Sequence, residues 1–182
     1  FLLTGGLSND LIHKLLLKKK KKFISRLDKK KINNNKNYIF LKRKGYFIKK
    51  NFINDTTLKK IRNHLNSQLG YYRSENLVNI KNKLKNLNIS KPEAVAFHYQ
   101  VSTILSCKEI QNLLINKEIL EFVQYYLGSL PIIDLVDCWW SFPTIKPDKE
   151  VAQMWHFDMD RPRWIKVFIF LGDSGSYLGA FL

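Results

Sequence analysis

The chain has 182 residues, 45% of them hydrophobic and 13% aromatic, and its 31 basic and 15 acidic residues give a net charge of +16. This composition is typical of one globular domain and excludes collagen-like and wholly disordered chains. No apolar run reaches the roughly 18 residues that a membrane span requires. The two cysteines, Cys107 and Cys138, are too few for a disulfide framework. We therefore expect a reducing, cytoplasmic location and no transmembrane segment.

The basic residues lie mainly in the first half of the chain. Residues 1–90 contain 23 Lys or Arg and 4 acidic residues, whereas residues 91–182 contain 8 and 11. A surface of this charge could attract nucleic acid, anionic lipid or an acidic substrate. The same half is rich in Asn and Ile, so a general compositional bias of a solvated surface is the stronger explanation. Because the aromatic and glycine pattern of a single-strand-binding sheet is lacking, the sequence does not favour a nucleic-acid partner.

The first elements follow the basic extension that we assign to residues 1–37. Residues 38–41 and 45–48 are short apolar runs rich in aromatic and β-branched side chains, which predicts two short strands. A helix is then predicted to begin with Asp55 as its cap and to end at Gly70, because its leucines and isoleucine recur at spacings of three and four.

Two consecutive helices are predicted in the middle of the chain. The first carries Ile110, Leu113 and Leu114 on one side. The second has Asn116 as its N-terminal cap and Gly128 at its C-terminal end, the position where glycine commonly stops a helix. We expect Pro131 to close this helical part.

After Pro131 the sequence changes to a strand-like pattern. Residues 132–142, 151–158 and 165–171 are predicted strands because they are rich in β-branched and aromatic residues. Helices followed by antiparallel strands indicate an α+β fold.

The residues with most chemical potential lie in the second of these strands. His156 and Asp158 are two positions apart, so in a strand both side chains point to the same face and can reach one cation. An imidazole and a carboxylate suit Fe(II), Mn(II) or Zn(II). The pattern is so short that chance alone can produce it, which makes it weak evidence by itself. Histidine and aspartate also occur as ordinary hydrogen-bonding groups on surfaces.

Lys166 is the second candidate. In the predicted strand of residues 165–171 it shares a face with Phe168 and Phe170. A lysine on an aromatic face needs an anion or a path to solvent, because an unpaired buried ammonium is costly. It therefore either binds a carboxylate, such as that of a dicarboxylate co-substrate, or extends to solvent at a strand edge.

Five segments in this order resemble phytanoyl-CoA dioxygenase-like proteins, and the resemblance covers about residues 38–182. The segments are residues 45–48 with the helix after Asp55, residues 126–128 before Pro131, residues 139–143, residues 153–158 and residues 166–173. The resemblance implies an Fe(II)- and 2-oxoglutarate-dependent oxygenase that hydroxylates a small organic substrate with O2. It also implies a double-stranded β-helix, the jelly-roll or cupin-like barrel, after the N-terminal helices.

The resemblance also assigns roles to single residues. His156 and Asp158 match the first two iron ligands of the family. Lys166 and Gln153 would contact 2-oxoglutarate, and Trp140 and Ser141 would line the same pocket, although a core or surface role remains open for these four.

The second histidine and the arginine that complete the family's site do not follow Lys166 in this sequence. We therefore expect the chain to be the N-terminal portion of a longer protein, with an incomplete barrel and no activity by itself. Two other functions stay open. One is a non-catalytic binding module on the same fold, and the other is a basic anion-binding domain.

Overall fold

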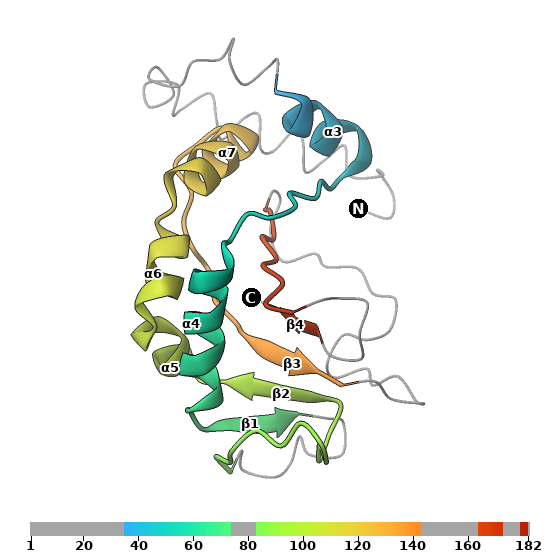
Figure 1. Cartoon of the computed structure of the whole chain (residues 1–182). Helices are drawn as coiled ribbons and strands as arrows, with labels where there is room; N and C mark the ends of the chain where they lie inside the picture. The colour runs from blue at the N-terminus through green and yellow to red at the C-terminus, as the bar shows by residue number, and fades with distance from the viewer. Residues whose placement is uncertain (1–34, 74–82, 143–163, 173–178, 182) are drawn as a thin grey trace. The chain divides into compact units, whose positions relative to one another are not determined.

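The computed structural model describes residues 35–73, 83–142, 164–172 and 179–181, and these form two compact units (Figure 1). The first unit contains residues 35–52, 114–133 and 164–166, and the second contains residues 53–73, 83–113, 134–142, 167–172 and 179–181. Most of the predicted N-terminal extension therefore lies outside the described residues.

Five helices and four strands are described. The helices are α3 (Lys36–Lys44), α4 (Asp55–Asn66), α5 (Val101–Ser106), α6 (Lys108–Leu114) and α7 (Lys117–Leu127). The strands are β1 (Gly70–Arg73), β2 (Ala96–Tyr99), β3 (Trp139–Ser141) and β4 (Gly179–Phe181). The α+β class is thus confirmed. No described helix has the length and apolar character needed to cross a membrane.

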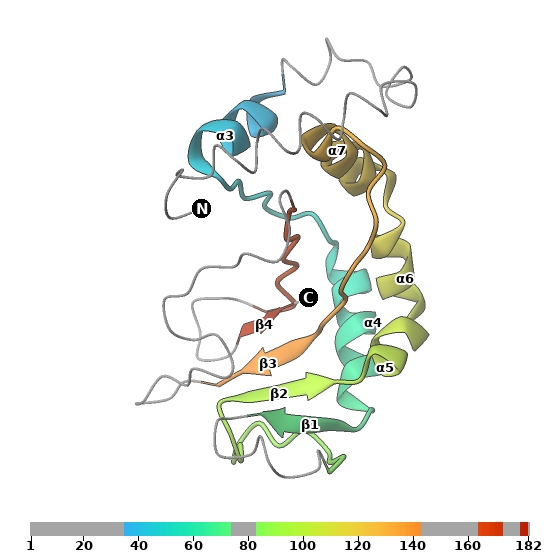
Figure 2. The same ribbon diagram turned by 180° about the vertical axis from the view of Figure 1, so that it is seen from behind.

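The four strands form one antiparallel sheet in the order β1-β2-β3-β4, which Figure 2 shows from behind. Its register places Tyr71 opposite His98 and His98 opposite Trp139, while Phe97 lies opposite both Tyr72 and Trp140. Because neighbouring residues of a strand point to opposite faces, these two rows of side chains lie on opposite faces of the sheet.

The row through Phe97 forms part of the core of the second unit. Phe97 is fully buried, and so are Ile61 and Leu65 of α4 and Ile104 of α5. Burial of each such side chain stabilises the fold by about 1.5–3 kcal/mol. The helices are also joined by polar contacts, since His64 Nε2 of α4 lies 3.2 Å from both Thr103 O and Ser106 Oγ. This core fixes one face of the sheet and leaves the row through His98 on the other.

The first unit is held together by aromatic rings. Tyr38 of α3 is buried and its ring contacts those of Tyr125 and Phe122 of α7 edge-on, with centroid distances of 4.4 and 6.2 Å. Phe47, in the segment after α3, adds a ring contact with Phe122 at 4.7 Å. Helix α3 therefore packs with one side on α7.

The strand predicted over residues 38–41 is wrong, because these residues lie within α3. Asn35 caps the helix by accepting a hydrogen bond from the Asn37 N–H, and Gly45 ends it in the left-handed conformation at φ 80°. A fully apolar run has no readable period, so its composition alone could not distinguish strand from helix. Residues 45–48 are not a strand either.

The predictions for the helices after residue 54 are largely confirmed. Helix α4 is present, although Asn54 rather than Asp55 is its cap and it ends at Asn66, four residues before Gly70. Helices α6 and α7 agree with the predicted pair, with Asn116 capping α7 and Gly128 ending it at φ 73°.

The strand predictions are only partly correct. Within residues 132–142 only Trp139–Ser141 forms a strand, residues 165–169 have no strand pairing, and residues 151–158 lie outside the described residues. The sequence analysis missed β1, β2, β4 and the short helix α5. Because β1 and β2 precede α5 to α7, helices and strands are not separated along the chain as expected.

Candidate functional site

Three of the four predicted cofactor and metal residues, Gln153, His156 and Asp158, lie outside the described residues. The fourth, Lys166, is exposed, and its Nζ lies 5.0 Å from the centroid of the Trp164 ring. Residues 164–169 around Lys166 have no strand pairing, so the predicted strand is not formed there. Lys166 is therefore a surface residue whose ammonium lies near the Trp164 ring.

The prediction that Trp140 and Ser141 line the same pocket is wrong. They are neighbours in β3 and consequently point to opposite faces of the sheet. Trp140 is buried in the row through Phe97, where its Nε1–H donates a hydrogen bond of 3.0 Å to Tyr99 Oη. Burial is the main reason that the pKa of the Tyr99 hydroxyl is raised to about 12. Only Ser141 lies on the face that carries His98.

The face with His98 contains a polar pair that the sequence analysis did not identify. His98 of β2 is 6% exposed, and its Nδ1 lies 3.3 and 3.2 Å from Oδ1 and Oδ2 of Asp137. Asp137 precedes β3, and its Oδ1 also accepts a 2.8 Å hydrogen bond from the Cys138 backbone N–H. Because an ionised carboxylate can only accept hydrogen bonds, Nδ1 of His98 is the protonated nitrogen.

The imidazole of His98 is held between two aromatic rings. Tyr71 of β1 and Trp139 of β3 stack on it from either side, each with a centroid distance of 5.8 Å and with interplanar angles of 20° and 13°. The Trp139 ring is contacted in turn by Phe168, edge-on at 6.4 Å. We call Tyr71, His98, Asp137 and Trp139 the His98 cluster. Tyr71 and Trp139 thus hold the two faces of the His98 imidazole, and Asp137 holds one edge.

The charge of Asp137 dominates the electrostatics of the cluster. Burial by itself would raise the pKa of this carboxyl, but the hydrogen bond and charge of His98, the Cys138 N–H and the charge of Arg73 outweigh it and hold the pKa below its usual value. Burial, followed by the charge of Asp137, raises the pKa of the Tyr71 hydroxyl. The carboxylate therefore stays ionised, and the phenol stays protonated.

The second ring nitrogen of His98, Nε2, differs from Nδ1 in its surroundings. Nε2 is buried and makes no hydrogen bond within the part of the chain that the structure describes. With Nδ1 protonated, Nε2 carries a lone pair that can accept a hydrogen bond, accept a proton or ligate a metal. A carboxylate behind a histidine is the arrangement that orients catalytic bases and metal-ligating histidines. The His98 cluster is thus the described site with most chemical potential.

The neighbouring thiols are not reactive groups. Cys107 and Cys138 are both buried and free. Burial, together with the nearby charges of Asp137 and Cys107, raises the pKa of the Cys138 thiol to about 12, so the reactive thiolate is negligible near neutral pH. Among the described residues no group of three or more His, Cys, Asp or Glu is placed to hold a metal ion.

The sequence contained only a weak signal for the His98 cluster. His98 alternates with apolar neighbours in residues 96–99, which places it on the side opposite Phe97 and Tyr99 once a strand is recognised. Its partner Asp137 is 39 residues away, and no motif connects the two.

Comparisons with protein-family models, with curated proteins and with solved structures found no match to this chain.

Proposed function

We propose that this chain is part of a non-haem Fe(II)- and 2-oxoglutarate-dependent oxygenase similar to the phytanoyl-CoA dioxygenase-like family, which hydroxylates a small organic substrate with O2. The observation that carries the proposal is the pair His156 and Asp158, preceded and followed in the expected order by four other family-like segments. The finer fold that goes with this function is a jelly-roll barrel. An antiparallel sheet such as β1 to β4 is compatible with one half of such a barrel.

The donor set fits the metal. One neutral imidazole and one carboxylate, with one more histidine, are the ligands that Fe(II) takes in oxygenases, and they leave three positions for co-substrate and oxygen. Of the described histidines, His64 contacts α5 through Nε2, whereas His98 contacts Asp137 through Nδ1 and makes no described hydrogen bond through Nε2. The third ligand stays unassigned, because no second histidine follows Lys166 in this sequence.

The chain's own residues then have distinct tasks. His156 and Asp158 would hold the metal, and bound Fe(II) with 2-oxoglutarate supplies the oxidation of a C–H bond by O2. The Lys166 ammonium would bind a carboxylate of 2-oxoglutarate through a charge-assisted hydrogen bond. The Gln153 amide would contact the co-substrate or the substrate.

The experiment measures succinate formation from 2-oxoglutarate by the whole protein, with and without Fe(II). We expect Fe(II)-dependent turnover that His156→Ala abolishes and that Lys166→Gln weakens through a higher KM for 2-oxoglutarate. His64→Gln is the matched control, because its amide can keep a hydrogen bond to α5. Turnover that survives His156→Ala would refute the assignment of the metal site. Fe(II) binding without any turnover would instead support the non-catalytic binding module.

A further inference from the structure

The surface of α3 that faces away from α7 combines apolar and basic side chains. At 100° per residue, Ile39, Phe40 and Arg43 lie on the side of the helix opposite the buried Tyr38 and Leu41. Ile39 and Phe40 are 44% and 43% exposed. The side of α3 that would normally be fully polar therefore carries two large apolar side chains.

The segment after α3 extends this apolar surface. Tyr46 and Ile48 are 58% and 76% exposed. The Tyr46 ring packs edge-on against Phe40, with 5.7 Å between ring centroids and an interplanar angle of 89°. Single exposed apolar residues are common, but four within ten residues, two of them in contact, form a continuous apolar ridge.

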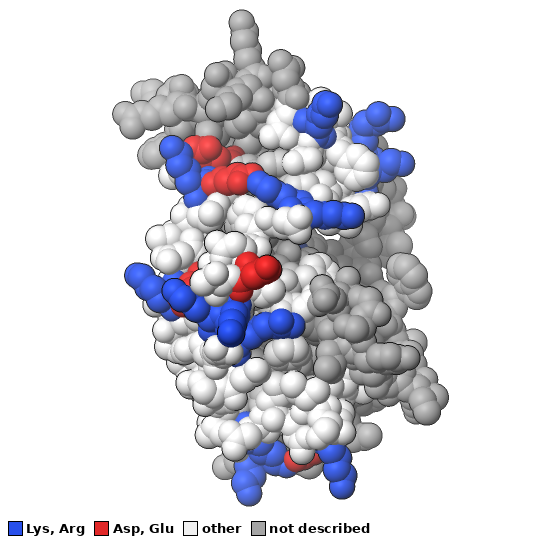
Figure 3. All heavy atoms as spheres, viewed as in Figure 1, with Lys and Arg blue, Asp and Glu red and all other residues white. Residues whose placement is uncertain are grey.

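The chain segment that carries this ridge has charges of one sign only. Residues 35–50 contain six basic residues and no acidic residue, and three of the six form the last turn of α3. The basic residues are Lys36, Lys42, Arg43, Lys44, Lys49 and Lys50. Figure 3 shows blue side chains at the upper right, where Figure 1 places α3, and further groups of them elsewhere on the same face.

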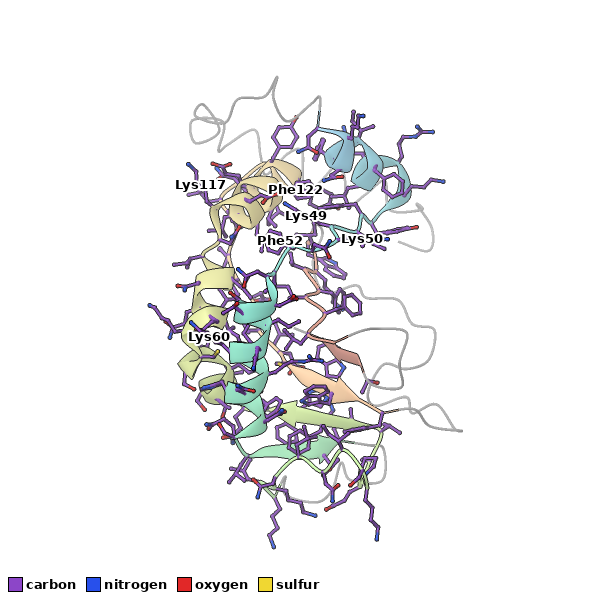
Figure 4. The ribbon with its side chains drawn as sticks, viewed as in Figure 1. Lys49, Lys50, Phe52, Lys60, Lys117 and Phe122 are labelled. Carbon is purple, nitrogen blue, oxygen red and sulfur yellow. The ribbon has the colours of Figure 1, made fainter. Side chains whose placement is uncertain are left out.

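Lys49 and Lys50 differ in their surroundings. Lys49 forms an ion pair with Glu118 of α7, and its Nζ lies 4.9 Å from the centroid of the Phe52 ring. Lys49, Lys50 and Phe52 are labelled in Figure 4. Lys50 is exposed. Lys49 thus belongs to the contact with α7, and Lys42 lies on the Tyr38 side of α3, with its Nζ 5.8 Å from the centroid of the Tyr38 ring. The other four basic residues, together with Ile39, Phe40, Tyr46 and Ile48, make up what we call the α3 surface.

We propose that the α3 surface binds anionic lipid membranes as a peripheral site. Apolar side chains that enter the boundary between headgroups and acyl chains, surrounded by lysines and arginines at the level of the headgroups, are the features of interfacial membrane binding. Tyrosine is favoured at this depth, because its ring is apolar and its hydroxyl is polar. The site is separate from the proposed oxygenase function and does not depend on it.

A nucleic acid is the less fitting partner for the same charge. Aliphatic side chains such as Ile48 offer no ring for stacking, and the edge-on packing of Phe40 against Tyr46 joins the two rings to each other. Both aliphatic and aromatic side chains can insert into a membrane interface. The apolar ridge therefore favours lipid over RNA.

The test is cosedimentation of the protein with phosphatidylcholine vesicles that contain phosphatidylserine, and with vesicles of phosphatidylcholine alone. We expect binding only to the anionic vesicles, and weaker binding as salt increases. Each basic side chain near a membrane contributes about fivefold in affinity. The triple variant with Lys36→Gln, Arg43→Gln and Lys44→Gln should therefore bind about a hundredfold more weakly.

Two matched controls separate this site from general charge and hydrophobicity. Lys59→Gln, Lys83→Gln and Lys91→Gln together remove the same charge from exposed positions of the second unit and should change binding less than twofold. Ile48→Ser should weaken binding. Ile132→Ser should not, although Ile132 is even more exposed than Ile48 and belongs to the same first unit. Equal losses in the two charge variants, or equal binding to uncharged vesicles, would overturn the proposal. Salt-dependent binding of a single-stranded RNA with no vesicle binding would also overturn it.

Discussion

The ion pair of the His98 cluster gives the sharpest prediction about stability. In Asp137→Asn, the new side chain can still accept the hydrogen bond from the Cys138 N–H, so the main loss is the charged partner of His98 Nδ1. A hydrogen bond to a charged group contributes about 1.5–3 kcal/mol. Because the Asp137 side chain is 33% exposed, water screens part of this energy, and we expect a loss of about 1–2 kcal/mol in the free energy of unfolding.

The loss should depend on pH in one direction. The folded protein holds the pKa of Asp137 below the value of about 3.9 that an aspartate has in an unfolded chain. The ionised carboxylate therefore contributes its full stabilisation above that value, and the contribution is lost as the pH falls through the folded-state pKa. We expect wild type and Asp137→Asn to differ at pH 7 and to approach each other in acid.

Thermal and urea unfolding measured by circular dichroism test this reasoning. A loss of 1–2 kcal/mol lowers the Tm of a chain of this size by about 2–8 °C. Glu121→Gln is the control, because it removes an exposed i,i+4 partner of Lys117 worth only about 0.3–0.5 kcal/mol. A stability loss in Asp137→Asn that is no larger than in the control, or that stays constant from pH 7 to acid, would refute the role we assign to the pair.

Three further predictions concern the packing of the same structure. Gly70→Ala should lower the free energy of unfolding in urea by about 2 kcal/mol or more, because the added Cβ would lie 2.4 Å from the Phe97 ring. If the variant is as stable as the wild type, the two strands do not approach so closely. Gly128→Ala should cost about 1 kcal/mol, with Gly128→Asn losing less, because φ is 73° at the end of α7; equal stability of both variants and wild type would contradict the left-handed cap. Cys107 and Cys138 should react with a thiol reagent at pH 8 only after denaturant is added, and rapid labelling of the native protein would disprove their burial.

The sequence by itself determined the elements whose signals are local. Helices α6 and α7 could be predicted because their apolar spacing, the Asn116 cap and the Gly128 stop lie within a few residues of one another. The presence of both helical and strand-like segments likewise predicted the α+β class, although not the order of its elements. The metal-ligand motif of His156 and Asp158 is also a local pattern, and it stays a prediction.

Tertiary structure decided the elements whose partners are distant. Residues 38–41 are helical because Tyr38 and Leu41, three positions apart, both pack inward and Tyr38 meets the rings of α7 more than eighty residues later in the chain. The four-residue strands β1 and β2 are too short to show a period, and they exist through pairing with each other and with β3. The pairing of His98 with Asp137 follows from that register. Sequence neighbours encode caps and periods, whereas a buried polar pair depends on which strands the whole core brings together.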